Sequence, residues 1–424
     1  MLNERKTEAY CAILAEELLL ATGCTEPIAV AYCAAKLREV LGVQPEKVLA
    51  EVSGNILKNV KSVVVPNTGG RRGIDAAIAV GIVAGDASAE LQVLAGVTES
   101  DTAKIQAYLD SSEITVTCPE TPCMLDIRLT GWAGAHKAVT RVANNHTNLV
   151  YMEKDGQVLL EKPMSASAED NLQDKSVLNV KDILTFIETV PIERIRPLIS
   201  RQIQCNSAIA AEGLKGDWGA NIGSTLLATG TGIETEARAW GAAGSDARMS
   251  GCEMPVVIVS GSGNQGMTTS LPVIEYARDM GASEEELYRA LAVADLVTIH
   301  QKTGIGRLSA FCGAVSAGCG AAAGIAYLRG GRYDVVAHTI ANTLAICSGM
   351  ICDGAKPSCA AKIASAVDAG LMGYYMYVNG GHQFVGGEGI IQKGVENTIG
   401  NVGRLARLGM RGTDEEILDI MVGR

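Results

Sequence analysis

Aromatic residues are scarce in this chain of 424 residues: they make up 4% of it, with three Phe and three Trp. Apolar residues nevertheless reach 47%, and 48 residues are glycine. The core must therefore be filled by Ala, Val, Ile, Leu and Met, with helices packed closely through Gly and Ala. A chain of this length is expected to form two or three domains.

Basic charge is also in short supply, because 36 Lys and Arg stand against 47 Asp and Glu, which gives a net charge of −11. A nucleic-acid partner requires a basic face for its phosphates, so this balance argues against one. No secretory signal is recognisable at the start of the chain. Twelve cysteines without such a signal predict a reducing, cytoplasmic setting, in which thiols bind metals, catalyse or pack rather than form disulfides.

Long apolar runs are nearly absent as well. The segment from Leu308 to Leu328 has no charge over 21 residues, which is long enough to cross a bilayer. It consists mainly of Ala, Gly, Ser and Cys rather than Leu, Ile and Phe, so its transfer into lipid would be weak. We therefore expect a buried helix there and no membrane partner.

Several familiar motifs are missing, including a P-loop, HExxH and any CxxC pair, and the last absence argues against a structural zinc ribbon. The run from Ser260 to Gly266 contains GxGxxG, but no following strand ends in an acidic residue at the distance that dinucleotide binding requires. A glycine loop that presents backbone N–H groups and polar side chains to a small ligand fits this run better. Its candidate ligand-binding side chains are Ser262, Asn264 and Gln265.

The periodicity of the sequence predicts an α+β fold. Helical patterns dominate beyond about residue 195, so we expect an α+β substrate-binding domain over 1–195 and an all-helical domain over 196–424. A polar loop is predicted over 53–59, and a surface loop or lid over 162–176. Strands of a mostly antiparallel sheet are predicted at 48–52, 62–65, 113–118, 124–130, 137–143 and 148–153.

Three cysteines form a possible metal site. Cys352 and Cys359 flank a short turn containing Gly and Pro, and Cys312 lies upstream near the start of another helix. Thiolates are the ligands that iron–sulfur clusters prefer, and three of them would leave one iron open as a Lewis acid. Free cysteine is also a common small core residue, so the spacing alone leaves packing as an alternative.

Cys24 stands at a predicted helix start, followed by Thr25, Glu26 and Pro27. The helix dipole is expected to lower the pKa of a thiol there, and the free N–H groups form an anion site. Cys24 is therefore a candidate acid or base, or a fourth cluster ligand. An ordinary capped turn with a buried thiol is the alternative.

Polar side chains in other loops are candidates for substrate binding. Asn55, Lys58 and Asn59 suit a carboxylate or an amino group, and Arg248 suits bidentate binding of a carboxylate. His146 lies in a similar polar stretch. Each of these stretches is equally consistent with an ordinary polar loop.

Four motifs together resemble the L-cysteine desulfidase family, which is related to the iron–sulfur L-serine dehydratases. They are Gly23–Pro27, Ser260–Gly266, Arg307–Cys312, and Met350–Ala355 with Cys359. The resemblance implies a PLP-independent lyase with a [4Fe–4S] cluster, and a homodimer. The implied reaction is β-elimination from L-cysteine, which yields hydrogen sulfide, ammonia and pyruvate.

The resemblance also implies roles for individual residues. Cys312, Cys352 and Cys359 match the cluster ligands, although Gly354 stands where the dehydratases have a proline. The turn at residues 25–27, aided by Asn55 or Lys58, would hold the α-carboxylate. Cys24 is the first candidate for removing the α-proton, and Lys58 is the second.

Other functions remain open at this stage. The same scaffold would suit L-serine or another β-substituted amino acid. A different class of protein is a non-catalytic or sensory cluster protein, and a cluster-free helical protein that binds a small ligand is a further possibility.

Overall fold

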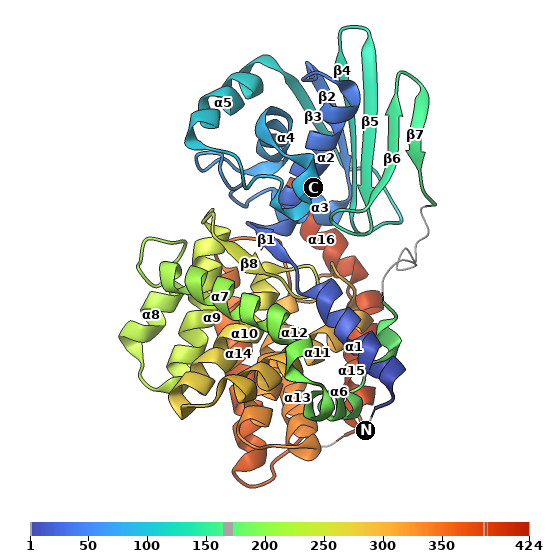
Figure 1. The fold of residues 1–424 in the computed structure, drawn as a ribbon. Coiled ribbons are helices and arrows are strands. Elements are labelled where there is room, and N and C mark those ends of the chain that lie inside the picture. Colours follow the sequence, from blue (N-terminus) through green and yellow to red (C-terminus); the bar gives the residue numbers. More distant parts are fainter. Residues whose placement is uncertain (1, 164–172, 385, 388, 424) are drawn as a thin grey trace.

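The computed structural model describes residues 2–163, 173–384, 386–387 and 389–423. One lobe is built around a sheet and the other consists of helices (Figure 1). This arrangement confirms the predicted α+β class. The loop predicted over 162–176 falls largely on residues 164–172, which lie outside the described residues. The domain division at residue 195 stays a prediction.

The sheet of the first lobe has six strands in the order β3-β2-β4-β5-β6-β7. The β2–β3 pair is parallel and the remaining neighbours are antiparallel, so the sheet is mixed. Its strands are β2 (Lys47–Val52), β3 (Glu113–Thr117), β4 (Asp126–Ala133), β5 (His136–Ala143), β6 (Leu149–Lys154) and β7 (Gln157–Glu161).

One face of this sheet is covered by α2 (Thr25–Leu41) and α4 (Gly73–Ala84), with α5 (Thr102–Ser111) beside α4 (Figure 1). Along β2, buried residues alternate with more exposed ones, as expected for a strand with one covered face. The helices α2 and α4 touch closely, because a Cβ on Gly81 would lie 2.3 Å from the Ala31 carbonyl oxygen. The opposite face is more open, since the Arg128 side chain on it is 41% exposed.

Two predictions in this lobe are wrong. The expected loop over 53–59 is the helix α3 (Gly54–Val60), whose Ile56 and Val60 are buried. The expected strand over 62–65 has one isolated bridge, from Val64 to Arg72, and is otherwise a loop. Its valines are buried by tertiary packing rather than by pairing in a sheet, and a short continuous apolar run does not distinguish these cases.

The second lobe is a closely packed helical assembly. Close contacts go through glycine: a Cβ on Gly320 would lie 2.1 Å from Thr298 Oγ1, and one on Gly318 would lie 2.6 Å from the Ala366 carbonyl oxygen. Its main helices are α7 (Arg196–Gly213), α8 (Ile222–Thr229), α9 (Ile233–Met249), α10 (Gly263–Met280), α11 (Glu284–Ile305), α12 (Gly313–Leu328), α13 (Tyr333–Cys347), α14 (Cys359–Val378) and α15 (Val395–Arg404).

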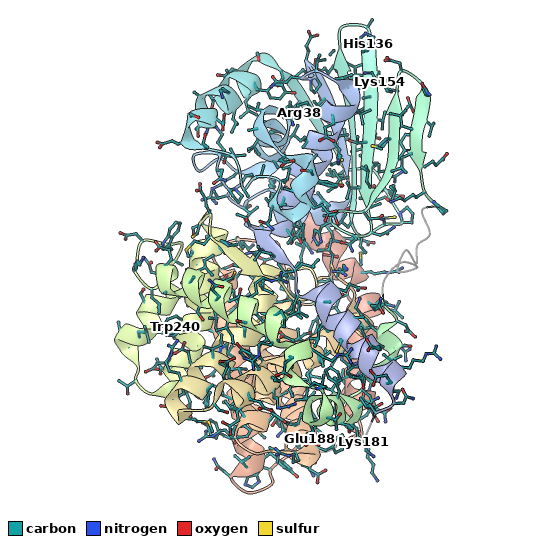
Figure 2. The ribbon with its side chains drawn as sticks, viewed as in Figure 1. Arg38, His136, Lys154, Lys181, Glu188 and Trp240 are labelled. Carbon is teal, nitrogen blue, oxygen red and sulfur yellow. The ribbon has the colours of Figure 1, made fainter. Side chains whose placement is uncertain are left out.

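The uncharged run at 308–328 contributes the buried helix α12 to this lobe, as expected. No helix in the described part of the chain is long and apolar enough to cross a membrane. Two helices from the first half, α1 (Glu4–Glu17) and α6 (Val180–Thr189), pack against α11 and belong spatially to the helical lobe (Figure 1). His136 and Lys181 lie near opposite ends of the molecule (Figure 2).

The interior of the helical lobe contains a buried carboxyl group. Asp295 on α11 is fully buried, and its Oδ1 accepts a hydrogen bond from Gln202 Nε2 on α7 at 2.8 Å. Burial raises the pKa of Asp295 to about 7, against the lowering effect of this hydrogen bond. The folded state therefore favours the protonated carboxyl group.

Two of the contacts between the lobes involve whole elements. The short strands β1 (Leu20–Thr22) and β8 (Pro255–Val257) form an antiparallel pair. The last helix, α16 (Arg411–Val422), packs against α3 of the sheet lobe (Figure 1). The starts of α2, α3 and α10 thus lie near the junction, where the candidate site residues gather.

Candidate active site

Cys312 and Cys352 are held side by side by two short stretches that run antiparallel. The Cys312 N–H donates to the Met350 carbonyl at 3.1 Å, and the Cys352 N–H donates to the Ala310 carbonyl at 2.7 Å. An isolated antiparallel bridge lies between these two hydrogen bonds. The start of α12 and the loop before α14 therefore bring two predicted cluster ligands together.

Cys359, the first residue of α14, lies in the same place. Burial raises the pKa of the Cys312 thiol, and the neighbouring charges of Cys352 and Cys359 contribute to the rise. Burial likewise raises the pKa of the Cys359 thiol, again with a contribution from Cys352. Such mutual effects require the three thiols to lie within electrostatic reach of one another.

Gly354 fixes the path of the loop that carries Cys352. Its φ is +96°, and a Cβ there would lie 2.4 Å from the Lys58 carbonyl oxygen. Only glycine adopts this conformation without strain, and proline, whose φ is fixed near about −65°, is excluded from it. The glycine that replaces the dehydratases' proline at this position thus allows the loop to pack closely on α3.

A buried cation accompanies the thiols. Lys302 is 5% exposed, and its ammonium group has no hydrogen bond or ion-pair partner among the described residues. Burial lowers the pKa of Lys302 to about 8, while the nearby Cys352 and Cys312 act to raise it. A buried lysine without a carboxylate partner requires some other negative charge beside it.

The donor set fits an iron–sulfur cluster. No three His, Cys, Asp or Glu side chains of the described residues converge on one point as ligands of a single metal ion. An iron–sulfur cluster does not require its ligands to converge on one point, because each thiolate binds a different iron and the thiolates are spaced around the cluster. Three soft thiols with buried Lys302 beside them suit an occupant that carries net negative charge.

Cys24 immediately precedes the first residue of α2, as expected, and is 3% exposed. Its Sγ lies 3.1 Å from Glu26 Oε2, to which it donates a hydrogen bond. The expected lowering of its pKa is wrong: burial and the charge of Glu26 raise the pKa of the Cys24 thiol well above its usual value, against the opposing effect of Arg248. Burial therefore outweighs the helix dipole at this position.

Glu26 connects Cys24 to a histidine from the sheet. Glu26 Oε1 lies 3.8 Å from His146 Nε2, and the imidazole is 3% exposed. Burial acts to raise the pKa of Glu26, but the nearby His146 and Cys24 lower it to about 2. Thr25 Oγ1 donates to the Gly261 carbonyl at 2.9 Å, which ties the start of α2 to the glycine loop. The carboxylate is thus held ionised beside a buried thiol.

Arg248 carries unpartnered donors into the same region. This residue of α9 is 2% exposed, and its Nη1 donates to Asn264 Oδ1 at 3.2 Å. Its Nε and Nη2 are buried and have no hydrogen-bond partner in the described part of the chain. Buried donors of a charged group are rarely left unpaired, so this guanidinium can receive a carboxylate.

Gln265 links the glycine loop to the thiols. Its Oε1 is buried without a partner among the described residues, and a Cβ on Gly313 would lie 2.8 Å from its amide group. Gly313 directly follows Cys312. Ser262 precedes the first residue of α10 and is partly exposed. The predicted side chains of the glycine loop therefore face two parts of the site, Asn264 toward Arg248 and Gln265 toward Cys312.

Cys24 at the start of α2 and the three thiols meet around Arg248. Cys24 forms a small buried apolar cluster with Val63 and Met249, against which Cys359 also packs. Burial raises the pKa of both Cys24 and Cys359, and the nearby charge of Arg248 acts against that rise in each. The structure thus brings the start of α2, the glycine loop and the three thiols to one place.

The polar side chains of α3 contact residues outside this site. Lys58 is buried, and its ammonium group forms an ion pair with Asp414 of α16. Asn55 Nδ2 is directed to Met124 Sδ at 3.4 Å, and Asn59 is 7% exposed. The backbone of α3 supports the thiol loop, whereas the ammonium group of Lys58 is occupied elsewhere.

Three more residues complete the site: Lys302, which sequence reasoning did not select, and His146 and Arg307, which it named without giving them a role. Lys302 lies in the polar run from His300 to Thr303, which gives no distinct signal. Arg307 pairs with buried Glu17 at 3.0 Å, and its Nη1 lies 3.1 Å from the position of a Cβ on Gly261. The Arg307–Glu17 pair joins residues that lie far apart in the sequence.

Comparisons with known proteins give a consistent result. A family model described as "Serine dehydratase alpha chain" matches residues 88–419. This span contains Arg248, the glycine loop and the three thiols, and it begins after Cys24 and Lys58.

The chain is also similar along its whole length to bacterial relatives described as UPF0597 proteins. One from Desulfitobacterium hafniense is 54% identical over 423 residues, covering 100% of this chain and 98% of the relative. One from Treponema denticola is 47% identical over 428 residues, covering 99% of each chain. One from Lachnoclostridium phytofermentans is 48% identical over 411 residues, covering 97% of this chain and 98% of the relative.

Proposed function

The chain belongs to the serine dehydratase alpha chain family, and from this premise we propose that it is a lyase that eliminates the β-substituent of a small amino acid. We propose L-cysteine as the substrate, with hydrogen sulfide, ammonia and pyruvate as products. The observation that supports a cluster-dependent elimination is the meeting of three thiols with a buried arginine whose donors are unpartnered.

In this proposal, Cys312, Cys352 and Cys359 hold a [4Fe–4S] cluster. When bound, the cluster supplies an open iron that acts as a Lewis acid toward the β-sulfur of the substrate. Lys302 places a buried positive charge beside these thiols and stabilises their ionised form. A soft sulfur leaving group is favoured over a hydroxyl group by thiophilic iron.

The substrate carboxylate would bind Arg248 Nε and Nη2, the buried donors without partners. Backbone N–H groups at the start of α2 would assist, as the anion site of that helix. Lys58 is less suited to this role or to proton removal, because its ammonium group is paired with Asp414. The positions of Asn264 and Gln265 suit the orientation of the substrate between the two halves of the site.

Elimination requires a base to remove the α-proton. The electron pair of the Cα–H bond then forms the Cα–Cβ double bond as the Cβ–S bond breaks. Cys24 remains the candidate for proton transfer, because its thiol packs near Cys359 and its hydrogen bond gives the proton a path to Glu26. The sulfide released takes up a proton. The aminoacrylate then adds water and loses ammonia to give pyruvate.

The test is anaerobic purification with iron and sulfide analysis, followed by assays of hydrogen sulfide and pyruvate from L-cysteine. Cys312→Ser, Cys352→Ser and Cys359→Ser are each expected to lose iron. Cys319→Ser is the matched control, because Cys319 is a fully buried cysteine of the same helix α12. It is expected to retain iron, and iron retained in all four variants would refute the cluster assignment.

Cys24→Ala separates the two proposed roles of that thiol. We expect it to retain the cluster and lose turnover. Loss of iron in this variant would instead make Cys24 a fourth ligand. Normal turnover with normal iron content would remove Cys24 from the chemistry.

L-Serine is the second candidate substrate, and the name of the matched family favours it. Turnover of L-serine faster than that of L-cysteine would replace our choice of substrate without changing the cluster assignment. Iron without turnover of either amino acid would instead support a non-catalytic cluster protein. A cytoplasmic homodimer is our proposal for the assembly, which light scattering of the purified protein tests.

A further inference from the structure

A row of charged side chains crosses the open face of the sheet, in the lobe away from the thiols. Arg128 of β4 lies directly opposite Arg141 of β5 in the strand register. The row continues through Tyr151 of β6 to Glu161 of β7, and on the other side it reaches Glu51 of β2. Directly opposed side chains share one face of a sheet, so these five residues form a continuous line on it.

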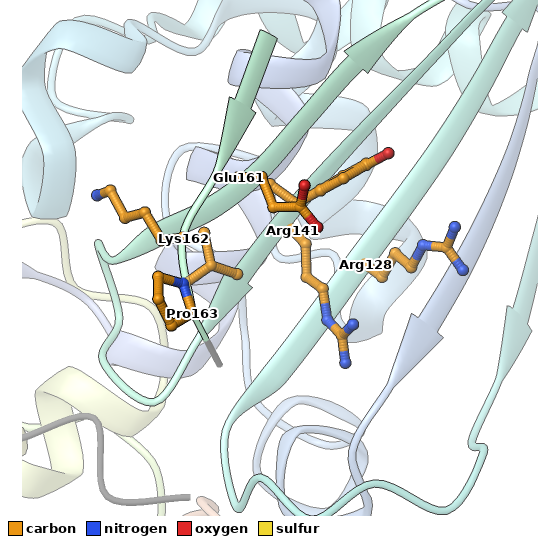
Figure 3. Close-up of a pocket in the computed structure, with 7 residues that line it drawn as sticks. Arg128, Arg141, Glu161, Lys162 and Pro163 are labelled. Atoms are coloured by element: carbon orange, nitrogen blue, oxygen red, sulfur yellow. The ribbon is translucent and has the colours of Figure 1, made fainter. Parts of the chain in front are cut away.

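A cavity of about 660 Å³ lies over this row. Figure 3 shows the Arg128 and Arg141 side chains extending from neighbouring strands beside Glu161 and the Lys162–Pro163 segment. A second cavity of about 230 Å³ shares both arginines and extends the hollow toward β2, where Glu51, Glu120 and Asp126 also line it. The combined hollow has the size of typical small-molecule sites, which span about 300–1,000 Å³.

The two arginines are only partly neutralised. Arg141 Nε and Nη2 donate to Asp126 at 2.8 and 2.6 Å, and Arg128 Nη1 donates to Glu51 at 3.2 Å. Arg128 Nε and Nη2 and Arg141 Nη1 have no hydrogen-bond partner among the described residues. Like charges directly opposite one another destabilise a sheet, so a further anion between these guanidinium groups would be stabilising.

The remaining lining selects the kind of anion. Lys162 adds a third cation at the rim, where its backbone N–H donates to the Val150 carbonyl at 2.9 Å. Tyr151 and Pro163 supply an aromatic and apolar surface. The Glu161 carboxylate would repel an anion, so the arginine end of the cavity is the end that attracts one. Paired arginines match the oxygens of a phosphate group, and an aromatic surface suits a ring.

We propose that this cavity binds a small phosphorylated metabolite that carries a ring, with its phosphate on Arg128 and Arg141 and its ring against Tyr151. The inference is independent of the proposed elimination, because the cavity shares no residue with the thiol site. A mononucleotide is a probe with the required chemistry and size.

The test is isothermal titration calorimetry of the purified protein with AMP, adenosine and inorganic phosphate at low ionic strength. AMP is expected to bind at least tenfold more tightly than either of the other two, because it carries both the phosphate and the ring. Arg128→Gln is expected to weaken AMP binding about tenfold, through loss of a charge-assisted hydrogen bond. Arg128 has 41% of its side chain exposed, so this variant is expected to fold.

Lys47→Gln is the matched control. It removes one positive charge from the same sheet face, where Lys47 pairs with Glu113 and lies outside both cavities. It should leave AMP binding unchanged. Glu161→Gln removes the repelling carboxylate and is expected to tighten AMP binding a few-fold, a gain that misfolding would not produce.

Three results would overturn the proposal. The first is the absence of AMP binding to the wild-type protein. The second is adenosine binding as tightly as AMP, which would remove the phosphate from recognition. The third is equal weakening by Arg128→Gln and Lys47→Gln, which would indicate general attraction to a charged surface.

Discussion

Replacement of Gly354 by alanine adds only one methyl group, yet it should prevent binding of the proposed cluster. Gly354 has a φ of +96°, and an added Cβ would lie 2.4 Å from the Lys58 carbonyl oxygen. Gly330, in the turn between α12 and α13, has a φ of +86° and no atom within 4 Å of an added Cβ. The two glycines thus share a backbone conformation and differ in the space around them.

The difference between the two variants has a defined size. A non-glycine residue in a left-handed conformation costs about 1–2 kcal/mol, and this term applies to both positions. At Gly354 the Cβ must also move by roughly 1 Å to reach ordinary contact distance, and overpacking of this kind costs about 1–3 kcal/mol. We therefore expect about 1–2 kcal/mol of destabilisation for Gly330→Ala and about 2–5 kcal/mol for Gly354→Ala.

The larger cost falls on the loop that carries Cys352, so Gly354→Ala should also lose iron. Urea unfolding of the apo-proteins followed by circular dichroism measures the stability difference, and iron analysis after anaerobic purification measures the cluster. Gly330→Ala should retain the iron content of the wild-type protein. Equal destabilisation of the two variants, with iron kept in both, would refute the role assigned to the contact between Gly354 and Lys58.

Three further predictions concern buried charges. Arg248→Lys should raise KM for the amino-acid substrate about tenfold or more at unchanged iron content, because lysine lacks the two parallel donors of arginine. An unchanged KM would show that Arg248 does not bind the substrate carboxylate. Asp414→Asn should lower the free energy of unfolding, measured in urea, by about 3–5 kcal/mol, because it leaves the Lys58 ammonium group buried without a partner. The double variant Lys58→Met, Asp414→Leu should recover most of that lost stability. Burial raises the folded-state pKa of Asp295 to about 7, so the folded protein binds the extra proton and stability should fall as the pH rises from about 4 to about 7. Asp295→Asn should reduce that fall, which urea midpoints at pH 5 and pH 8 measure, and an undiminished fall would assign it to other groups.

Local patterns accounted for much of the fold. The strands from 113 to 153 were expected close to their observed positions, because alternating burial on one face of a sheet leaves a period-two pattern. Two other patterns misled: the valine run at 62–65 belongs to a buried loop, and the polar stretch at 53–59 forms a helix of seven residues, Gly54–Val60. Short segments at the junction of two lobes take their structure from tertiary contacts that periodicity does not report.

The candidate site was predictable in its cysteines and less so in its charges. Cys312, Cys352 and Cys359 were selected by residue type, and the structure gathers them. The sequence predicted a lowered pKa for Cys24, because a helix start can be recognised in the sequence. The pKa is raised instead, since Cys24 is buried beside the ionised carboxylate of Glu26, and the sequence does not reveal that burial. The partner of Lys58 could not be foreseen for a related reason, since Asp414 is brought to it only by the packing of the last helix.

The docking of α16 on α3 also sets an order of events during biosynthesis. The Lys58–Asp414 contact spans 356 positions of the chain, so it cannot form until nearly the whole polypeptide has left the ribosome. Until then, the face of α3 that backs the thiol loop lacks its final support. Binding of the proposed cluster is therefore expected after translation, and a nascent chain that stops short of Asp414 should bind it poorly.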